Sequence, residues 1–342
     1  MELKLCVISV DMSHITPEKV IHGGALLRHR KRTGRDFIDF SASLNPFPPD
    51  VRIEFDLEEA GAYPDDCYED LKEGISRIFQ RDTAEITVGN GSVEVIRSYC
   101  ASVLSPGDGV YIPQPTFGEY AMSVRLAGGV LLSEASGARV RFLCNPNNPD
   151  GELTSKDDIL AILDGLRDDQ CLFVDEAFIE LSDPGMSVSE IRHPALFVSR
   201  SITKSFAVPG LRFGFGFGDP DLVAVMERRR LPWTVNAFSE VYARAALDHY
   251  EDLAESRRRI CIERERLSDR LRALGLPPRP SSTNYLLVDL PFRAADLAAS
   301  LLDWGILVRD CASFGLPSAI RVAVRTEEEN RQLIEALSAC LP

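Results

Sequence analysis

The sequence predicts an α/β fold, with a mostly parallel sheet flanked by helices and a smaller α+β unit after it. Between residues 87 and 218, short runs of β-branched and aromatic residues alternate with helical stretches, as in successive βα units. After about residue 235 the pattern changes to long charged helix and then to a compact mixture of strand and helix. The length of 342 residues, at roughly 150 residues per domain, also favours about two domains.

The first unit is expected to contain six buried strands in one doubly wound layer. Each of them is a short apolar run, which is typical of strands that are covered on both faces. The predicted strands are residues 110–112, 130–132, 142–144, 172–174, 196–198 and 213–217. A helix is predicted to begin at Val93 and to end at the turn residues 105–109, Ser-Pro-Gly-Asp-Gly.

The second unit is expected to begin with one long charged helix over residues 240–274. Strands follow at 284–290 and 320–324, and a closing helix spans 326–341. Residues 1–45 are too short to fold alone and lead into a turn-rich stretch that begins at Asn45-Pro46, so we expect them to pack onto one of the two units.

Composition argues against several classes of partner. The chain has 38 Lys and Arg against 52 Asp and Glu, a net charge of −14, which repels nucleic acids and anionic membranes. Short basic clusters such as residues 28–35 are expected to be solvated surface. No apolar run reaches the roughly 18 residues that a membrane span needs. The eight cysteines are scattered without a C-x-x-C pair, which predicts buried thiols in a cytoplasmic protein and no metal site.

Two candidate ligand-binding turns lie where predicted strands end or helices begin, the edge at which open α/β sheets bind ligands. Residues 89–92, Gly-Asn-Gly-Ser, precede a helix, and their amides and hydroxyl suit a phosphate, although glycine before a helix is often only a turn. Residues 145–151, Asn-Pro-Asn-Asn-Pro-Asp-Gly, form a rigid turn that presents asparagine amides, and as a turn they need no function.

Two ionisable residues follow predicted buried strands directly. Asp175 is costly at the end of an apolar strand unless it meets a cation or caps a helix. Lys204, with Arg212 eight residues later, is either a surface lysine or a desolvated amine whose pKa falls until it can form a Schiff base. This order of features is the layout of a pyridoxal 5′-phosphate site: a turn suited to phosphate, a turn that presents asparagine amides, an aspartate and a lysine.

Specific strings extend this pattern over nearly the whole chain. They include Val174-Asp175-Glu176-Ala177-Phe178, Arg200-Ser201-Ile202-Thr203-Lys204, Pro209-Gly210-Leu211-Arg212 and Arg321-Val322-Ala323-Val324-Arg325. With them, the sequence resembles the aspartate aminotransferase superfamily, whose members are fold type I pyridoxal 5′-phosphate enzymes. His22-Gly23-Gly24, Trp233-Thr234-Val235-Asn236 and Arg309-Asp310-Cys311 look like the L-threonine-O-3-phosphate decarboxylases of cobalamin biosynthesis, and histidinol-phosphate aminotransferases are near relatives.

The resemblance implies a domain arrangement and a partner. Residues 46–240 would form the large cofactor-binding domain, with a mostly parallel seven-stranded sheet, and residues 1–45 and 241–342 the small domain. The protein would be a homodimer, in which Tyr63 reaches the cofactor phosphate of the neighbouring subunit.

The resemblance also assigns roles at the cofactor. Lys204 would hold the cofactor covalently and move protons, Asp175 would pair with the protonated pyridine nitrogen, and Phe117 would stack on the ring. Asn148 would hydrogen-bond to the 3′ oxygen. The cofactor phosphate would be held by Gly91, Ser92, Ser201 and Arg212.

The expected substrate is a small phosphorylated amino acid or amine. Arg321 would bind its carboxylate, next to Asn148, while Arg309 and the segment of His22 are candidates for its phosphate. The sequence departs from related patterns at Phe178, where aminotransferases usually have tyrosine, at Ala25, where the decarboxylases have asparagine, and at Asp150, where threonine is usual.

Two reactions follow from two ways of holding the substrate, because the bond perpendicular to the cofactor ring is the one that breaks. If the carboxylate is held out of the ring plane, carbon dioxide leaves and the product is (R)-1-amino-2-propanol O-phosphate. If the Cα proton lies there instead, Lys204 removes it and an aminotransferase of the histidinol-phosphate type results, with 2-oxoglutarate as partner substrate. The strings around His22, Trp233 and Arg309, together with Phe178, favour the decarboxylase.

Overall fold

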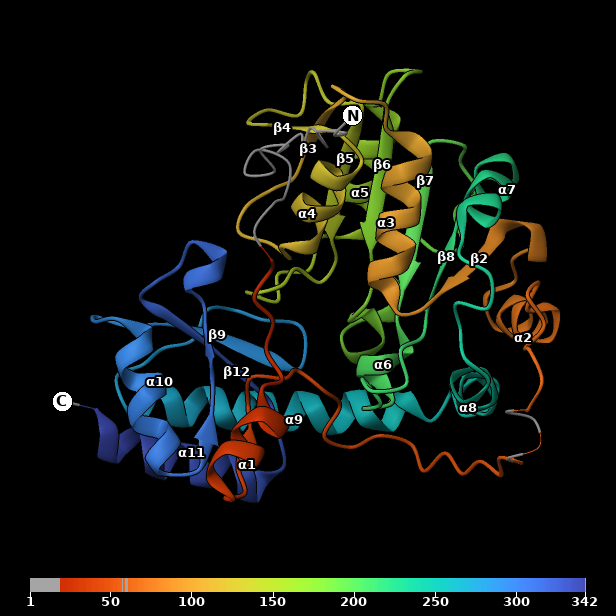
Figure 1. The fold of residues 1–342 in the computed structure, drawn as a ribbon. Helices are drawn as coiled ribbons and strands as arrows, with labels where there is room; N and C mark the ends of the chain where they lie inside the picture. Colours follow the sequence, from red (N-terminus) through yellow and green to blue (C-terminus); the bar gives the residue numbers. More distant parts are fainter. Residues whose placement is uncertain (1–18, 57, 59–60, 342) are drawn as a thin grey trace, which may run out of the picture.

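A seven-stranded sheet forms the centre of the larger part of the molecule in the computed structural model, which describes residues 19–56, 58 and 61–341 (Figure 1). Its strand order is β2-β8-β7-β6-β5-β3-β4, and only β8 runs against the others. The strands are β2 (Ile86–Gly89), β3 (Gly109–Tyr111), β4 (Val130–Leu132), β5 (Val140–Cys144), β6 (Cys171–Asp175), β7 (Leu196–Arg200) and β8 (Gly214–Phe217). The predicted fold class, with its mostly parallel sheet, is confirmed.

Helices cover both faces of this sheet, because successive residues of its strands point to opposite sides. Leu172 and Val174 pack into one core and Phe173 into the other. The first core also takes residues of α2 (Glu69–Phe79), α5 (Lys156–Asp164) and α8 (Ala237–Asp248). The second takes residues of α3 (Ser92–Val103), α4 (Glu119–Leu126) and α7 (Pro220–Arg229).

Two strand predictions need correction. β2 was not among the six predicted strands, although Ile86 and Val88 are buried against β8. The run 130–132 is a strand but not a buried one, since β4 lies at the edge of the sheet and leaves Val130 51% and Leu131 36% exposed. An edge strand has a neighbour on one side only, which the apolar run itself does not reveal.

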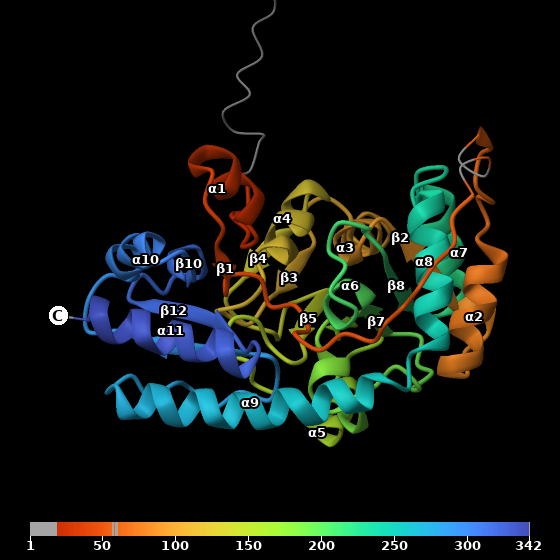
Figure 2. The same ribbon diagram turned by 90° about the horizontal axis from the view of Figure 1, so that it is seen from below.

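The prediction of one long helix over residues 240–274 is wrong. The chain forms α8 and then α9 (Leu253–Ala273), with a turn at residues 249–252 between them. At this turn Tyr250 enters the core, where its hydroxyl lies 3.2 Å from the carboxylate of Glu180. The turn sends α9 out along the second unit (Figure 2). Charge patterning predicts helix on both sides of such a turn but not the turn itself.

The second unit is built on the antiparallel sheet β11-β12-β9. Its strands are β9 (Tyr285–Asp289), β11 (Arg309–Asp310) and β12 (Ala319–Ala323), and its helices besides α9 are α10 (Ala294–Asp303) and α11 (Glu327–Cys340). The predicted strands at 284–290 and 320–324 and the closing helix therefore agree to within one residue at each end. α11 begins at a capping box formed by Thr326 and Glu329.

The described part of the N-terminal segment packs onto this second unit. It contains α1 (Leu26–Thr33) and β1 (Ile38–Asp39), which pairs in parallel with β10 (Ile306–Leu307). Phe40 lies in the core of the second unit. Residues 1–18 lie outside the described residues, and the division into residues 46–240 and 1–45 with 241–342 stays a prediction. The described residues also include the short helix α6 (Ile202–Ser205) and the 3-10 helices η2 (Thr83–Glu85), η3 (Ile179–Leu181), η4 (Pro184–Met186) and η5 (Ala312–Phe314).

The cysteines differ in burial, which corrects the expectation of uniformly buried thiols. Cys100, Cys144 and Cys311 are buried, but Cys67 is exposed, and Cys6 lies outside the described residues. In the described part of the chain, no helix is both long and apolar enough to cross a bilayer.

Candidate active site

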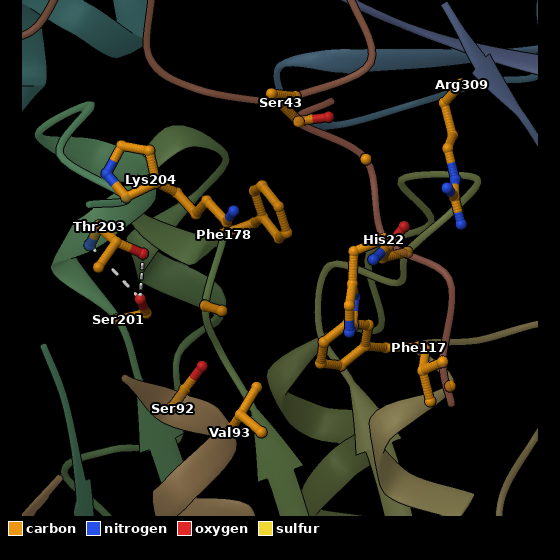
Figure 3. A pocket seen from close by; sticks show the side chains of 18 of the residues that line it. His22, Ser43, Ser92, Val93, Phe117, Phe178, Ser201, Thr203, Lys204 and Arg309 are labelled. Atoms are coloured by element: carbon orange, nitrogen blue, oxygen red, sulfur yellow. Dashed lines mark hydrogen bonds between the residues drawn. The ribbon is translucent and has the colours of Figure 1, made fainter. Parts of the chain in front are cut away.

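A cavity of about 450 Å³ lies between the central sheet, the second unit and residues 20–24. Nearly all of the predicted site residues line it, from both ends of the chain: His22, Ser92, Phe117, Asn148, Asp175, Ser201, Lys204, Arg212, Arg309 and Arg321. Figure 3 shows Lys204 and Phe178 on one side of the cavity and His22, Phe117 and Arg309 on the other. Gly91 and Tyr63 do not line it.

Lys204 extends into this cavity from α6 (Ile202–Ser205), the short helix that follows β7. Burial and the positive charges of Arg321 and Arg212 lower the pKa of its amine to about 8. No carboxylate within the described residues pairs with this amine. Roughly a fifth of it is therefore neutral at pH 7.4, against about one part in a thousand for an ordinary lysine, and the neutral form is the one that attacks an aldehyde.

Asp175 ends β6 and is held by three donors. The Tyr120 hydroxyl donates to Oδ2 at 2.7 Å, while the Ser199 hydroxyl at 3.0 Å and the Ala177 amide at 3.1 Å donate to Oδ1. Burial raises the pKa of this carboxyl group, and the three donors act in the opposite direction. The result is a buried carboxylate that is suited to pair with a cation in the cavity.

A candidate anion site lies where α3 begins. Gly91, at φ +82°, precedes the helix without capping it by a side chain, so the first-turn amides stay available to a ligand. A Cβ atom on Gly91 would collide with the guanidinium of Arg212, so Gly91 acts by letting Arg212 lie close to the backbone. The hydroxyl-bearing side chains of Ser92 and Ser201 line the same part of the cavity.

Aromatic side chains bound the cavity on two sides. Phe117 contacts Tyr120 edge to face, with 5.5 Å between ring centroids, and lies 6.0 Å from the ring of His22. Phe178 packs edge to face on Tyr285. These walls, an amine, a carboxylate and an anion site together fit a flat, phosphorylated heteroaromatic aldehyde such as pyridoxal 5′-phosphate.

Two buried arginines line the side of the cavity formed by the second unit. Arg309 and Arg321 are direct partners across the β11–β12 pair, so their side chains share one face of the sheet. Arg321 donates to Asn148 Oδ1 and, at 3.1 Å, to the Ser41 carbonyl. Arg309 donates to the Ile21 carbonyl and to Ser313 Oγ, each at 2.7 Å.

Neither arginine forms an ion pair with any described residue. Burial lowers the pKa of both guanidinium groups, and the charge of Arg321 lowers that of Arg309 further. Two buried cations without a carboxylate partner are unfavourable unless anions occupy the cavity. The second unit thus provides two adjacent candidate anion sites.

Several contacts in the site were missed by sequence reasoning. Tyr120 and Ser199 hold Asp175, and Glu119 lies 2.9 Å from His22 Nε2. Ser199 could have been found, because parallel neighbours β6 and β7 place it directly beside Asp175. Glu119 and Tyr120 carry no comparable signal, since a helix near a cavity contains many polar residues that do not face it.

Tyr63 lies outside the cavity of its own chain. Its ring is 78% exposed and stacks on Trp233 at 4.3 Å between centroids. Trp233 is itself 44% exposed, and so is Phe238, which lies close to it in the sequence.

Comparison with known proteins identifies the family. Residues 57–337 match the model described as aminotransferase class I and II. The chain belongs to this family. Among its relatives, the histidinol-phosphate aminotransferase of Symbiobacterium thermophilum is 33% identical, over 90% of this chain and 91% of the relative. A putative threonine-phosphate decarboxylase of Caldanaerobacter subterraneus is also 33% identical, over 86% and 88%.

The fold and the cofactor agree with the family. The structure of histidinol-phosphate aminotransferase from Sinorhizobium meliloti, in complex with pyridoxal-5′-phosphate, has a TM-score of 0.83 at 23% identity, covering 94% of this chain and 95% of that one. The cofactor of this protein is pyridoxal 5′-phosphate.

Proposed function

We propose that the protein decarboxylates L-threonine O-3-phosphate to (R)-1-amino-2-propanol O-phosphate, a step of cobalamin biosynthesis. The observation that carries the proposal is the pair of cross-strand arginines, Arg309 and Arg321, which are buried without carboxylate partners in the described chain. A substrate with a carboxylate and a phosphate on adjacent carbons supplies two anions to two adjacent cations.

Each arginine has a distinct part in holding the substrate. Arg321 is fixed from two sides, by Asn148 and by the Ser41 carbonyl, and would hold the carboxylate. Arg309, with Ser313 and His22 beside it in the cavity, would hold the phosphate. Two anchors on one sheet define the rotation about the Cα–N bond, and that rotation decides which bond at Cα stands perpendicular to the ring.

Lys204 supplies the proton chemistry. When bound, pyridoxal 5′-phosphate provides an electron-accepting ring for the electron pair that the carbon–carbon bond leaves at Cα as carbon dioxide departs. Asp175 stabilises positive charge at the ring nitrogen, and the Lys204 amine, with its pKa near 8, can deliver a proton to Cα. Residues 20–24 and the second unit line the side of the cavity opposite Lys204.

Phe178 supports decarboxylation over transamination. It is buried against Tyr285 and lines the cavity without a hydroxyl at the position where aminotransferases usually have tyrosine. One hydrogen bond to the 3′ oxygen is therefore missing from the site, as in the decarboxylases that the sequence resembles.

A second candidate is a histidinol-phosphate aminotransferase that uses 2-oxoglutarate and glutamate. It is favoured by the names of several relatives, among them the enzyme of Symbiobacterium thermophilum. Histidinol phosphate itself has no carboxylate, so in this reading Arg321 would serve the dicarboxylate partner substrate.

The experiment that separates the two uses the holoenzyme with each substrate set. With L-threonine O-3-phosphate, we expect stoichiometric release of carbon dioxide and formation of the amino alcohol phosphate, both lost in Lys204→Ala. No release of carbon dioxide, together with transfer of the amino group between glutamate and the histidinol-phosphate pair, would overturn the proposal and support the second candidate.

The proposal includes a homodimer in which Tyr63 completes the cofactor-phosphate site of a second copy. Its support is the exposed Tyr63–Trp233 stack outside the chain's own cavity. Mixing Lys204→Ala with Tyr63→Ala protein tests it, because a hybrid dimer has one site with both residues intact. Activity should return on mixing, and unchanged inactivity of hybrids shown to form would argue against shared sites.

A further inference from the structure

Tyr120 connects the aromatic wall of the cavity to the carboxylate at its base. It lies on α4, three residues after Phe117, and its ring meets Phe117 edge to face while its hydroxyl donates to Asp175 Oδ2 at 2.7 Å. We propose that Tyr120 is a positioning residue that holds Asp175 ionised and aimed at the ring nitrogen of the cofactor. The proposal goes beyond the proposed function, since it applies equally to a decarboxylase and to an aminotransferase.

The physical need for such a donor follows from burial. Asp175 is 3% exposed and pairs with no cation among the described residues. A buried carboxylate without compensation takes up a proton, and as a neutral acid it would stabilise a protonated pyridine far less. Donors to the charged form oppose this, and hydrogen bonds to charged groups are about twice as strong as those between neutral groups.

The two oxygens of Asp175 differ in the number of donors that they accept from. Oδ1 accepts from both the Ser199 hydroxyl and the Ala177 amide, whereas Oδ2 accepts from Tyr120 alone. A carboxylate oxygen has two lone pairs, so Oδ2 keeps one for the ligand while Tyr120 fixes its direction. The Tyr120 ring is itself fixed, because it stacks on Phe142 with 5.2 Å between centroids.

The test is the affinity of the apoprotein for pyridoxal 5′-phosphate as a function of pH, without any substrate. Tyr120→Phe removes the hydroxyl and keeps the ring. We expect its Kd to be about tenfold weaker than wild type near pH 6, and the difference to shrink toward pH 8. The sign follows because loss of a donor raises the pKa of Asp175, so protonation competes with ligand binding more strongly as pH falls.

Tyr99→Phe is the matched control. Tyr99 is equally buried, at 1% exposure, and packs among Phe142, Phe173 and Phe197, but its hydroxyl is not among the donors to Asp175. We expect no pH-dependent change of Kd in this variant. Ser199→Ala removes a donor from Oδ1 and should also weaken cofactor binding more at low pH than at high pH. If Tyr120→Phe does not fold, Ser199→Ala provides the test.

Two results would overturn the proposal. One is that Tyr120→Phe and Tyr99→Phe have the same Kd for pyridoxal 5′-phosphate at every pH. The other is a loss of affinity that is the same at all pH values, which would mean that the hydroxyl acts through packing and not through the charge of Asp175. Because no substrate is present, neither result bears on which reaction the enzyme catalyses.

Discussion

Glu119 Oε1 lies 2.9 Å from His22 Nε2 and links α4 to the N-terminal segment at the cavity. Glu119 is 5% exposed, and its other oxygen accepts from Arg97 at 2.9 Å. The carbonyl of the neighbouring residue Ile21 accepts a hydrogen bond from Arg309, on the second unit. Residues 20–24 are thus fixed to both parts of the molecule.

Glu119→Gln should weaken substrate binding with little effect on turnover. The change removes the charge that strengthens the hydrogen bond to His22, a loss of about 1 kcal/mol or roughly a fivefold rise in KM for the phosphorylated substrate. Steady-state kinetics measures it. Arg97→Gln is the control, because it removes the other partner of Glu119 and leaves His22 in place; an equal rise in KM there would show that the His22 contact is unimportant.

Arg309→Gln tests whether Arg309 binds the phosphate group of the substrate. We expect kcat/KM for L-threonine O-3-phosphate to fall by about 3 kcal/mol, or roughly 10²-fold, because a charge-assisted contact to a dianion is lost. Unphosphorylated threonine should be affected much less. The exposed Arg293→Gln serves as control, and a similar loss with both substrates would contradict the assignment of Arg309 to the phosphate.

The same substitution should stabilise the protein without ligand. Arg309 and Arg321 are buried like charges on paired residues, which is unfavourable. Removing one charge is expected to raise the free energy of unfolding of the apoprotein by about 1 kcal/mol in urea titrations. A clear decrease would mean that the contacts of Arg309 with Ile21 and Ser313 outweigh the repulsion.

Covalent attachment of the cofactor should accelerate with pH, with a midpoint near 8. The pKa of Lys204 is lowered to about 8, so its amine is mostly protonated below that pH and mostly neutral above it. Absorbance after rapid mixing with pyridoxal 5′-phosphate gives the rate, and Lys204→Ala gives no signal. In Arg321→Gln the midpoint should move upward, because one of the charges that lowers the pKa is gone; an unchanged midpoint would show that burial and Arg212 lower the pKa without help from Arg321.

A buried ion cluster behind the site should dominate the stability of the large unit. Arg200 is 2% exposed and lies 2.8 Å from Glu176 and 2.7 Å from Glu180. Arg200→Met leaves two buried carboxylates unpaired and should cost about 3–5 kcal/mol in urea unfolding. The triple variant with Glu176→Gln and Glu180→Gln should recover most of that loss, and failure to do so would point to packing around Phe79 instead.

The linear sequence contains most of what defines the central sheet. Short apolar runs predicted the strands from β3 to β8, because such runs are stable only where both faces are covered. Asp175 and Lys204 could be placed at strand ends for the same reason. The edge position of β4 and the turn between α8 and α9 could not, since both depend on which segment packs alongside.

What the sequence by itself determined is the fold class and the family, and it supplied the candidate groups for the cofactor. What only the tertiary structure decided is how those groups are held and which charges stay unpaired. Arg309 and Arg321 become neighbours through strand register, His22 meets Glu119 across 97 residues, and Tyr120 meets Asp175 across 55. Such contacts arise from packing between distant segments, and local propensity and periodicity do not encode them.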